Sequence, residues 1–126
     1  MTRLFLFGAA EKGPLHTPCV CRSLAELHER YGNPPYESLG IDSAIQALFF
    51  HKELIFFRVE EEGLTQEEYL HGLSLLRSEE TLKPISAVWM PGVGSNTLLS
   101  SGAAVCSACQ AILILTDKDF YDYLAT

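Results

Sequence analysis

The sequence predicts an α/β fold, a single compact domain over residues 1–126 with a mostly parallel four-to-five-stranded sheet and helices packed against it. Short apolar runs alternate with segments whose apolar residues recur at helical spacing, which is typical of parallel sheets connected by helices. Residues 53–59 (ELIFFRV) are apolar almost throughout, as expected for a strand covered on both faces. A length of 126 residues suits one domain with its own core.

The first half of the chain carries clear strand and helix signals. Residues 3–10 (RLFLFGAA) predict a buried strand that ends in small residues, and Gly13-Pro14 predicts a turn-rich loop after it. Residues 19–21 (CVC) continue as a short extended piece. Ser23 and Glu26 form a capping-box pattern for a helix that Gly32 ends.

The next helix is expected over residues 43–52, after the loop at residues 33–40 (NPPYESLG). Asp42 has a side chain suited to capping its first turn. The spacing predicts that one face of this helix is apolar and buried, made of Ala44, Ile45, Leu48 and Phe49.

The second half continues the alternation after the strand at residues 53–59. Thr65 and Glu68 form a second capping-box pattern, ahead of a buried stripe of Tyr69, Leu70, Leu73 and Leu76. Residues 85–92 predict a strand that enters a glycine loop, and residues 95–110 a helix of small residues interrupted by Gly102. Residues 111–116 predict a further strand, and Asp117 is expected to cap a final short helix.

Composition excludes several classes of function. The chain has 9 Lys and Arg against 16 Asp and Glu, a formal charge of −7, and lacks the clustered basic residues of a nucleic-acid surface. Its apolar runs are too short to span a membrane. The N-terminal run is too short, and its continuation too charged, for a signal peptide. We therefore expect a cytoplasmic protein that binds neither nucleic acid nor membrane.

Four cysteines raise the possibility of a thiol or zinc site, formed by Cys19, Cys21, Cys106 and Cys109. Cys106-x-x-Cys109 falls at the far end of a predicted helix, whose negative pole disfavours a thiolate, so a redox role has little support. A four-thiolate zinc site with Cys19 and Cys21 is conceivable, but that pair has only one intervening residue, and structural zinc pairs usually have two to four. We favour buried core cysteines and expect no metal or cofactor.

The turn at Gly92–Asn96 offers an alternative site of the phosphate type. A glycine-rich strand-to-helix turn can cradle phosphate with backbone amides at a helix N-terminus. The turn lacks the third glycine of a dinucleotide fingerprint and the Gly-Lys-Ser/Thr ending of a phosphate loop. We therefore favour a plain turn with Ser95 or Asn96 as the helix cap, and keep a small α/β ligand-binding module as the alternative.

The remaining polar residues form no recognisable catalytic group. His16, His28, His51 and His71 have no metal-ligand spacing, and no nucleophile elbow surrounds a serine. The acidic stretch of Glu60, Glu61, Glu62, Glu67 and Glu68 is expected to be a solvated face. Since no pattern assembles an acid, a base and an oxyanion donor, no catalytic residue is predicted, and we expect the protein not to be an enzyme.

Taken in order, these segments resemble the core of contractile tail sheath proteins, found in phages and related injection machines. The resemblance covers about residues 4–120, and its specificity lies in the order and spacing of individually simple turns and caps. The residues that carry it are Gly8, Ala10, Gly13, Pro14, Ser23, Tyr31, Gly32, Phe49, Phe50, Arg58, Val59, Pro91, Gly92 and Asp117.

The resemblance implies a structural or assembly protein that self-associates or docks on a phage-tail-like partner, in the cytoplasm or in a virion or tail particle. Sheath subunits are several times longer and are joined by extended terminal arms, which this sequence lacks. We therefore do not expect a contractile mesh formed by the usual strand exchange. From the residues themselves, the terminal aromatics Phe120, Tyr121 and Tyr123 are the predicted partner contacts, and sheet edges left open are sites for an added strand.

Overall fold

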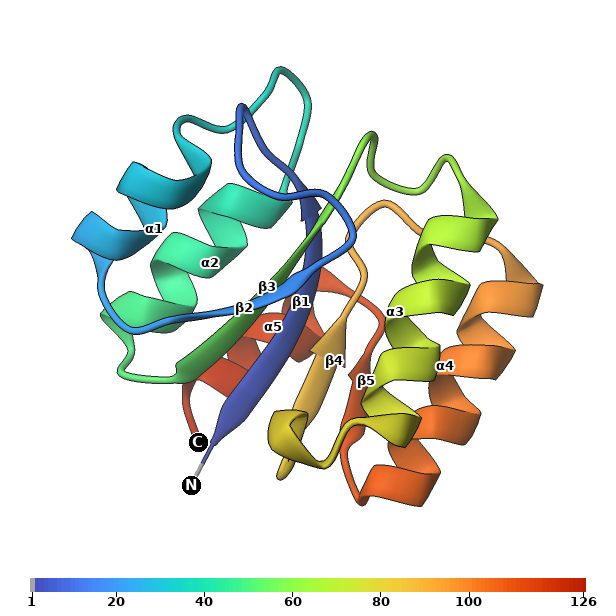
Figure 1. Ribbon diagram of the computed structural model, residues 1–126. Coiled ribbons are helices and arrows are strands. Elements are labelled where there is room, and N and C mark those ends of the chain that lie inside the picture. Colours follow the sequence, from blue (N-terminus) through green and yellow to red (C-terminus); the bar gives the residue numbers. More distant parts are fainter. Residues whose placement is uncertain (1) are drawn as a thin grey trace.

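The computed structural model describes residues 2–126 and confirms an α/β fold with a five-stranded, mostly parallel sheet (Figure 1). The strand order is β2-β3-β1-β4-β5, and only β2 runs antiparallel to its neighbour. The strands are β1 (Arg3–Ala9), β2 (Pro18–Cys21), β3 (Glu53–Val59), β4 (Ala87–Trp89) and β5 (Ile112–Ile114). The helices are α1 (Leu24–Tyr31), α2 (Gly40–Phe49), α3 (Gln66–Ser78), the 3-10 turn η1 (Glu80–Leu82), α4 (Asn96–Cys109) and α5 (Asp117–Leu124).

The sheet is buried on both faces, which explains why its central strands are apolar throughout. β1 pairs with β3 along all seven residues, from Arg3↔Glu53 to Ala9↔Val59. Successive side chains point to opposite faces. Leu4, Leu6 and Phe56 thus face α1, α2 and α5, while Phe5, Phe7 and Phe57 face α3 and α4 (Figure 1).

The caps of α1 and α4, formed by residues close together in the chain, agree with the prediction from the sequence. The Ser23 hydroxyl accepts a hydrogen bond from the Glu26 backbone N–H at 3.1 Å, and Gly32 ends α1 with a φ of 75°. Ser95 caps α4 in the same way through Leu98. Gly102 does not interrupt α4, because it is the point at which this helix packs closely on Met90 and Leu113.

The prediction for α2 is wrong in its start and in its buried face. The helix begins at Gly40, so Asp42 lies inside the first turn and does not cap it. Its buried side is formed by Gly40, Ile41, Ser43, Ala44 and Ala47, whereas Ile45 and Phe49 are exposed. The helix starts three residues earlier than expected, and its close contact with β1 at Gly40 and Gly8 places Ile41, Ala44 and Ala47 against the sheet.

The capping hydrogen bonds predicted for α3 and the cap residue predicted for α5 are also wrong. Thr65 is the N-cap residue of α3, as predicted, but its side chain makes no capping hydrogen bond. The Glu68 carboxylate, which a capping box would direct back to Thr65, binds His16 and Glu60 N instead. In α5 the capping hydroxyl belongs to Thr116, which accepts from Asp119 N at 3.1 Å, so Asp117 is the first helical residue. In the α3 stripe, Leu70 is exposed while Tyr69, Leu73 and Leu76 are buried.

Candidate functional site

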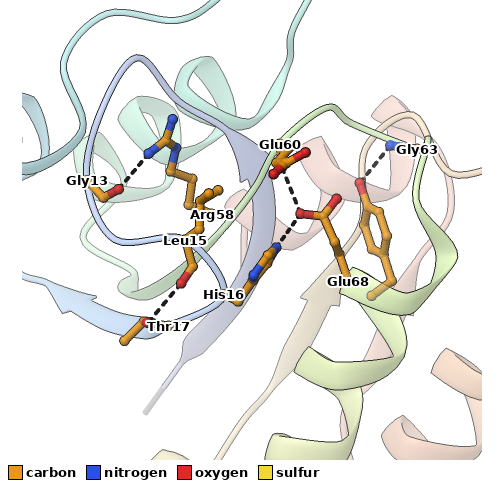
Figure 2. Close-up of polar contacts among 9 residues, drawn as sticks. Gly13, Leu15, His16, Thr17, Arg58, Glu60, Gly63 and Glu68 are labelled. Atoms are coloured by element: carbon orange, nitrogen blue, oxygen red, sulfur yellow. Dashed lines mark hydrogen bonds and ion pairs between the residues drawn. The ribbon is translucent and has the colours of Figure 1, made fainter.

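A cluster of polar contacts lies at the carboxyl end of the parallel strands, where open α/β sheets ordinarily hold their ligands (Figure 2). His16 comes from the β1–β2 connection and Glu68 from the first turn of α3, 52 residues later. The Nε2 atom of His16 forms a short contact with Oε2 of Glu68. The same carboxylate oxygen accepts the backbone N–H of Glu60 at 2.9 Å, so Glu68 joins three separate segments.

Glu68 corrects the expectation that the acidic stretch is a solvated face. Only 7% of this residue is exposed, and its second oxygen, Oε1, is buried without a hydrogen-bond partner among the described residues. Glu60, Glu61 and Glu67 are exposed as expected. The hydrogen-bond donors of a buried carboxylate are important for stability, because an unpaired buried charge destabilises the folded state.

Further hydrogen bonds hold the β1–β2 and β3–α3 connections at the carboxyl end of the sheet. The Arg58 guanidinium donates to the Gly13 carbonyl (Figure 2). His16 N donates to the Arg58 carbonyl at 3.0 Å. Next to Glu68, the hydroxyl of Tyr69 accepts the backbone N–H of Gly63 at 2.7 Å. Burial raises the pKa of Tyr69 to about 12, so the hydroxyl is neutral at physiological pH. The β1–β2 and β3–α3 segments are thereby fixed on the sheet.

The His16–Glu68 pair has part of the geometry of a proton-transfer site. A carboxylate that holds one ring nitrogen orients the imidazole so that the other nitrogen can act. His16 also has a φ of 56°, which non-glycine residues adopt infrequently. The neighbouring Thr17 hydroxyl donates to the Leu15 carbonyl at 3.0 Å instead of to His16. The arrangement therefore orients an imidazole but provides no nucleophile for it within the described residues.

The Gly92–Asn96 turn is an exposed strand-to-helix connection, as the sequence predicts. Ser95 is the cap residue, and Gly92 has a φ of 85° with its backbone against Glu62. A side chain added at Gly94 would meet nothing within 4 Å. The turn itself therefore leaves the Gly94 backbone open, but it packs beside an acidic segment, which is unfavourable for a phosphate.

The four cysteines do not come together. Cys19 and Cys21 lie in β2 against the α1–α2 face, whereas Cys106 and Cys109 lie in α4 on the opposite face. All four are free thiols, and burial raises the pKa of Cys21 and of Cys106 to about 11. A single four-thiolate zinc site would need all four at one point, so this geometry does not fit it. Within residues 2–126, no three His, Cys, Asp or Glu side chains are placed to hold a metal ion.

Of the three predicted partner contacts, the structure leaves one at the surface. Phe120 is 3% exposed and stacks on Trp89, with ring centroids 6.0 Å apart. Tyr123 is 4% exposed; its hydroxyl contacts the Ser86 hydroxyl at 2.9 Å, and its ring lies under the Lys52 ammonium. These two side chains anchor α5 to the sheet. Tyr121, by contrast, is 55% exposed.

An open edge of the sheet lies along β5, and we call it the β5 edge: Ile112, Leu113 and Leu115. β5 pairs only with β4 among the described strands, and Ile112 N donates to Ser86 O on the β4 side. The backbone groups of Leu113 therefore face outward. Ile112 and Leu115 are 53% and 56% exposed. A pocket of about 490 Å³ adjoins this edge, with Asp119 and Asp122 in its lining.

Comparisons with protein-family models, with curated proteins and with solved structures found no match to this chain. Within residues 2–126, no helix has the length and apolar character needed to cross a membrane. Any function therefore has to be inferred from the positions and contacts of this chain's own residues. The sequence did not indicate His16 and Glu68 as partners, because a contact over 52 residues leaves no local pattern.

Proposed function

We propose that this chain is a non-enzymatic structural or assembly protein, similar to the core of contractile tail sheath subunits, and that it associates through the β5 edge. It acts by self-association or by docking on a phage-tail-like protein, in the cytoplasm or in a virion or tail particle. The single observation that carries the proposal is the open backbone of Leu113 flanked by the exposed apolar side chains of Ile112 and Leu115.

The physical argument rests on what such an edge does in water. An unpaired strand offers N–H and C=O groups to a partner strand, and natural proteins usually protect their edges with charged side chains or proline. Here the flanking positions hold Ile112 and Leu115, which favour contact with another protein, and α5, the helix after β5, adds the exposed Tyr121. The carboxylates Asp119 and Asp122 at the adjoining pocket favour a partner with basic residues near the contact.

The test is the solution mass, measured by light scattering behind a sizing column over a wide concentration range. We expect the mass to rise with concentration, and Ile112→Lys to reduce that rise by placing a charge on the edge. Leu64→Lys is the matched control. Leu64 is 68% exposed and lies in the β3–α3 connection, and β1 and β4 separate β3 from β5 in the sheet. A strict monomer at every concentration would exclude self-association, and equal effects of the two substitutions would exclude the β5 edge.

A further inference from the structure

The Glu62 carboxylate is bound by three backbone N–H groups from two other parts of the chain. Its Oε1 accepts from Leu39 N at 2.7 Å, and its Oε2 accepts from Gly40 N at 2.8 Å and from Ala9 N at 3.0 Å. Leu39 and Gly40 begin α2, and Ala9 ends β1. Glu62 thus supplies the cap that α2 lacks, since Leu39 has no capping side chain.

Two glycines allow these donors to converge. A Cβ at Gly40 would lie 2.5 Å from the Gly8 Cα, and a Cβ at Gly8 would lie 2.7 Å from the Gly40 Cα. The backbones of β1 and α2 are therefore in direct contact, which brings the positive end of the helix dipole to the end of the central strand. Such a group of N–H donors is suited to an anion with two or more oxygens.

The segment that carries Glu62 is held on both sides. Glu60 N is bound by the buried Glu68, and Gly63 N by the Tyr69 hydroxyl, as Figure 2 shows. Gly63, with a φ of 77°, sits so close to Gly92 that a Cβ there would lie 2.2 Å from the Gly92 carbonyl oxygen. The backbone on either side of Glu62 is thus fixed, and its carboxylate is directed at α2 and β1.

We infer that Glu62 is a built-in anionic ligand. Its carboxylate fills the anion site formed by Ala9, Leu39 and Gly40, and closes that site to external anions. The carboxyl end of this sheet is thereby occupied by the chain's own side chain, and an external anion gains access only when the Glu60–Gly63 segment moves away. This inference concerns a different part of the molecule from the β5 edge and does not depend on the proposed function.

The test compares the melting temperatures of the wild type, Glu62→Ala and Glu61→Ala, in sodium acetate and in sodium chloride of equal ionic strength. Glu61 is the matched control, because it is the exposed neighbour of the same charge. We expect Glu62→Ala to melt about 5 °C or more below Glu61→Ala in chloride. Acetate should then raise its melting temperature saturably, and leave the wild type and Glu61→Ala unchanged.

Acetate is chosen as the probe because it carries the carboxylate that the substitution removes. An equal acetate shift in wild type and Glu62→Ala would overturn the inference, since the wild-type site would then be open. Equal melting temperatures for the two alanine variants, without an acetate effect, would overturn it as well.

A second measurement covers the case in which Glu62→Ala does not fold. Glu62→Gln keeps an acceptor oxygen but removes the charge. Amide hydrogen exchange at Leu39 and Gly40 should be at least about tenfold faster in this variant than in wild type, while exchange at Leu27 in α1 stays the same. Unchanged exchange at Leu39 and Gly40 would contradict the inference.

Discussion

The carboxyl end of the sheet and the β5 edge differ in whether their polar groups are hydrogen-bonded within the chain. At the carboxyl end of the sheet, carboxylates from Glu62 and Glu68 bind five donors, four of them backbone N–H groups, and close the region from within. At the β5 edge, the backbone of Leu113 faces outward, and apolar side chains flank it. Apart from the buried Glu68 Oε1, the oxygens of these two carboxylates at the carboxyl end, where this fold usually holds a ligand, are bonded within the chain, whereas the Leu113 backbone at the side of the sheet is open.

Among the substitutions considered for the carboxyl end of the sheet, replacement of His16 is expected to lower the free energy of unfolding most. We expect His16→Leu to lower the free energy of unfolding by about 3 kcal/mol, because it leaves the buried Glu68 carboxylate with one backbone donor. Urea unfolding measures this change. His51→Leu is the matched control, since His51 is exposed and also has a left-handed backbone, with a φ of 63°. A loss for His16→Leu no larger than for His51→Leu would contradict this role of the pair.

The next largest effect is expected at the contact between β1 and α2. Glycine-to-alanine changes in a helix usually stabilise, but a Cβ at Gly40 would lie 2.5 Å from Gly8 Cα and 2.8 Å from Glu62 Oε2. We therefore expect Gly40→Ala to lower the free energy of unfolding by about 2 kcal/mol.

Gly94→Ala is the control for this substitution. Gly94 lies in the Gly92–Asn96 turn and has open space around it, so the change should be neutral within about 0.5 kcal/mol. If both variants unfold at the same denaturant concentration, the close approach of the two backbones does not constrain this end of the sheet.

These contacts mark the limit of prediction from the sequence. Two caps formed within three residues were predicted: Ser23, and Ser95 as one of two candidates with Asn96. The equally local cap at Thr116 was missed in favour of Asp117. The buried character of residues 53–59 was predicted correctly. The capping box at Thr65 and Glu68 failed because a distant residue, His16, competes for the carboxylate. The cap at Asp42 failed because Glu62, 22 residues from Gly40, takes that role. Local patterns do not contain such competition.

The same limit applies to the terminal aromatics. Phe120, Tyr121 and Tyr123 are equivalent in a sequence as aromatic residues near the end of the chain. Helical geometry separates them, because positions 120 and 123 lie on one face of α5, which packs on the sheet, and position 121 lies on the other. The strand at residues 111–116 was predicted, but its place at the edge of the sheet follows from strand order, which local patterns do not give.

A smaller effect is expected from the buried thiol of Cys106, in the core between α4 and the sheet. Burial raises its pKa from 9.0 to about 11, so the folded state favours the neutral thiol. The stability it contributes is complete below pH 9 and is lost as the pH rises toward 11. Replacing the thiol removes this loss, so the stability difference between wild type and Cys106→Ala should shrink by about 1 kcal/mol from pH 7 to pH 10. Urea unfolding at both pH values measures it, and a constant difference would contradict the assignment.

The smallest effect on stability is expected at Tyr121, the one predicted partner contact that is exposed. Because its side chain is largely exposed, Tyr121→Ser should change the free energy of unfolding by less than about 0.5 kcal/mol. Its effect on association should nevertheless be measurable, since exposed tyrosines often carry a large share of the binding energy. Tyr36→Ser is the control: Tyr36 is 92% exposed and lies between α1 and α2, outside the β5 edge. Light scattering that shows weaker association for Tyr121→Ser, but not for Tyr36→Ser, would assign association to the exposed face of α5 rather than to exposed tyrosines in general. The reverse result would move the contact to the loop that carries Tyr36.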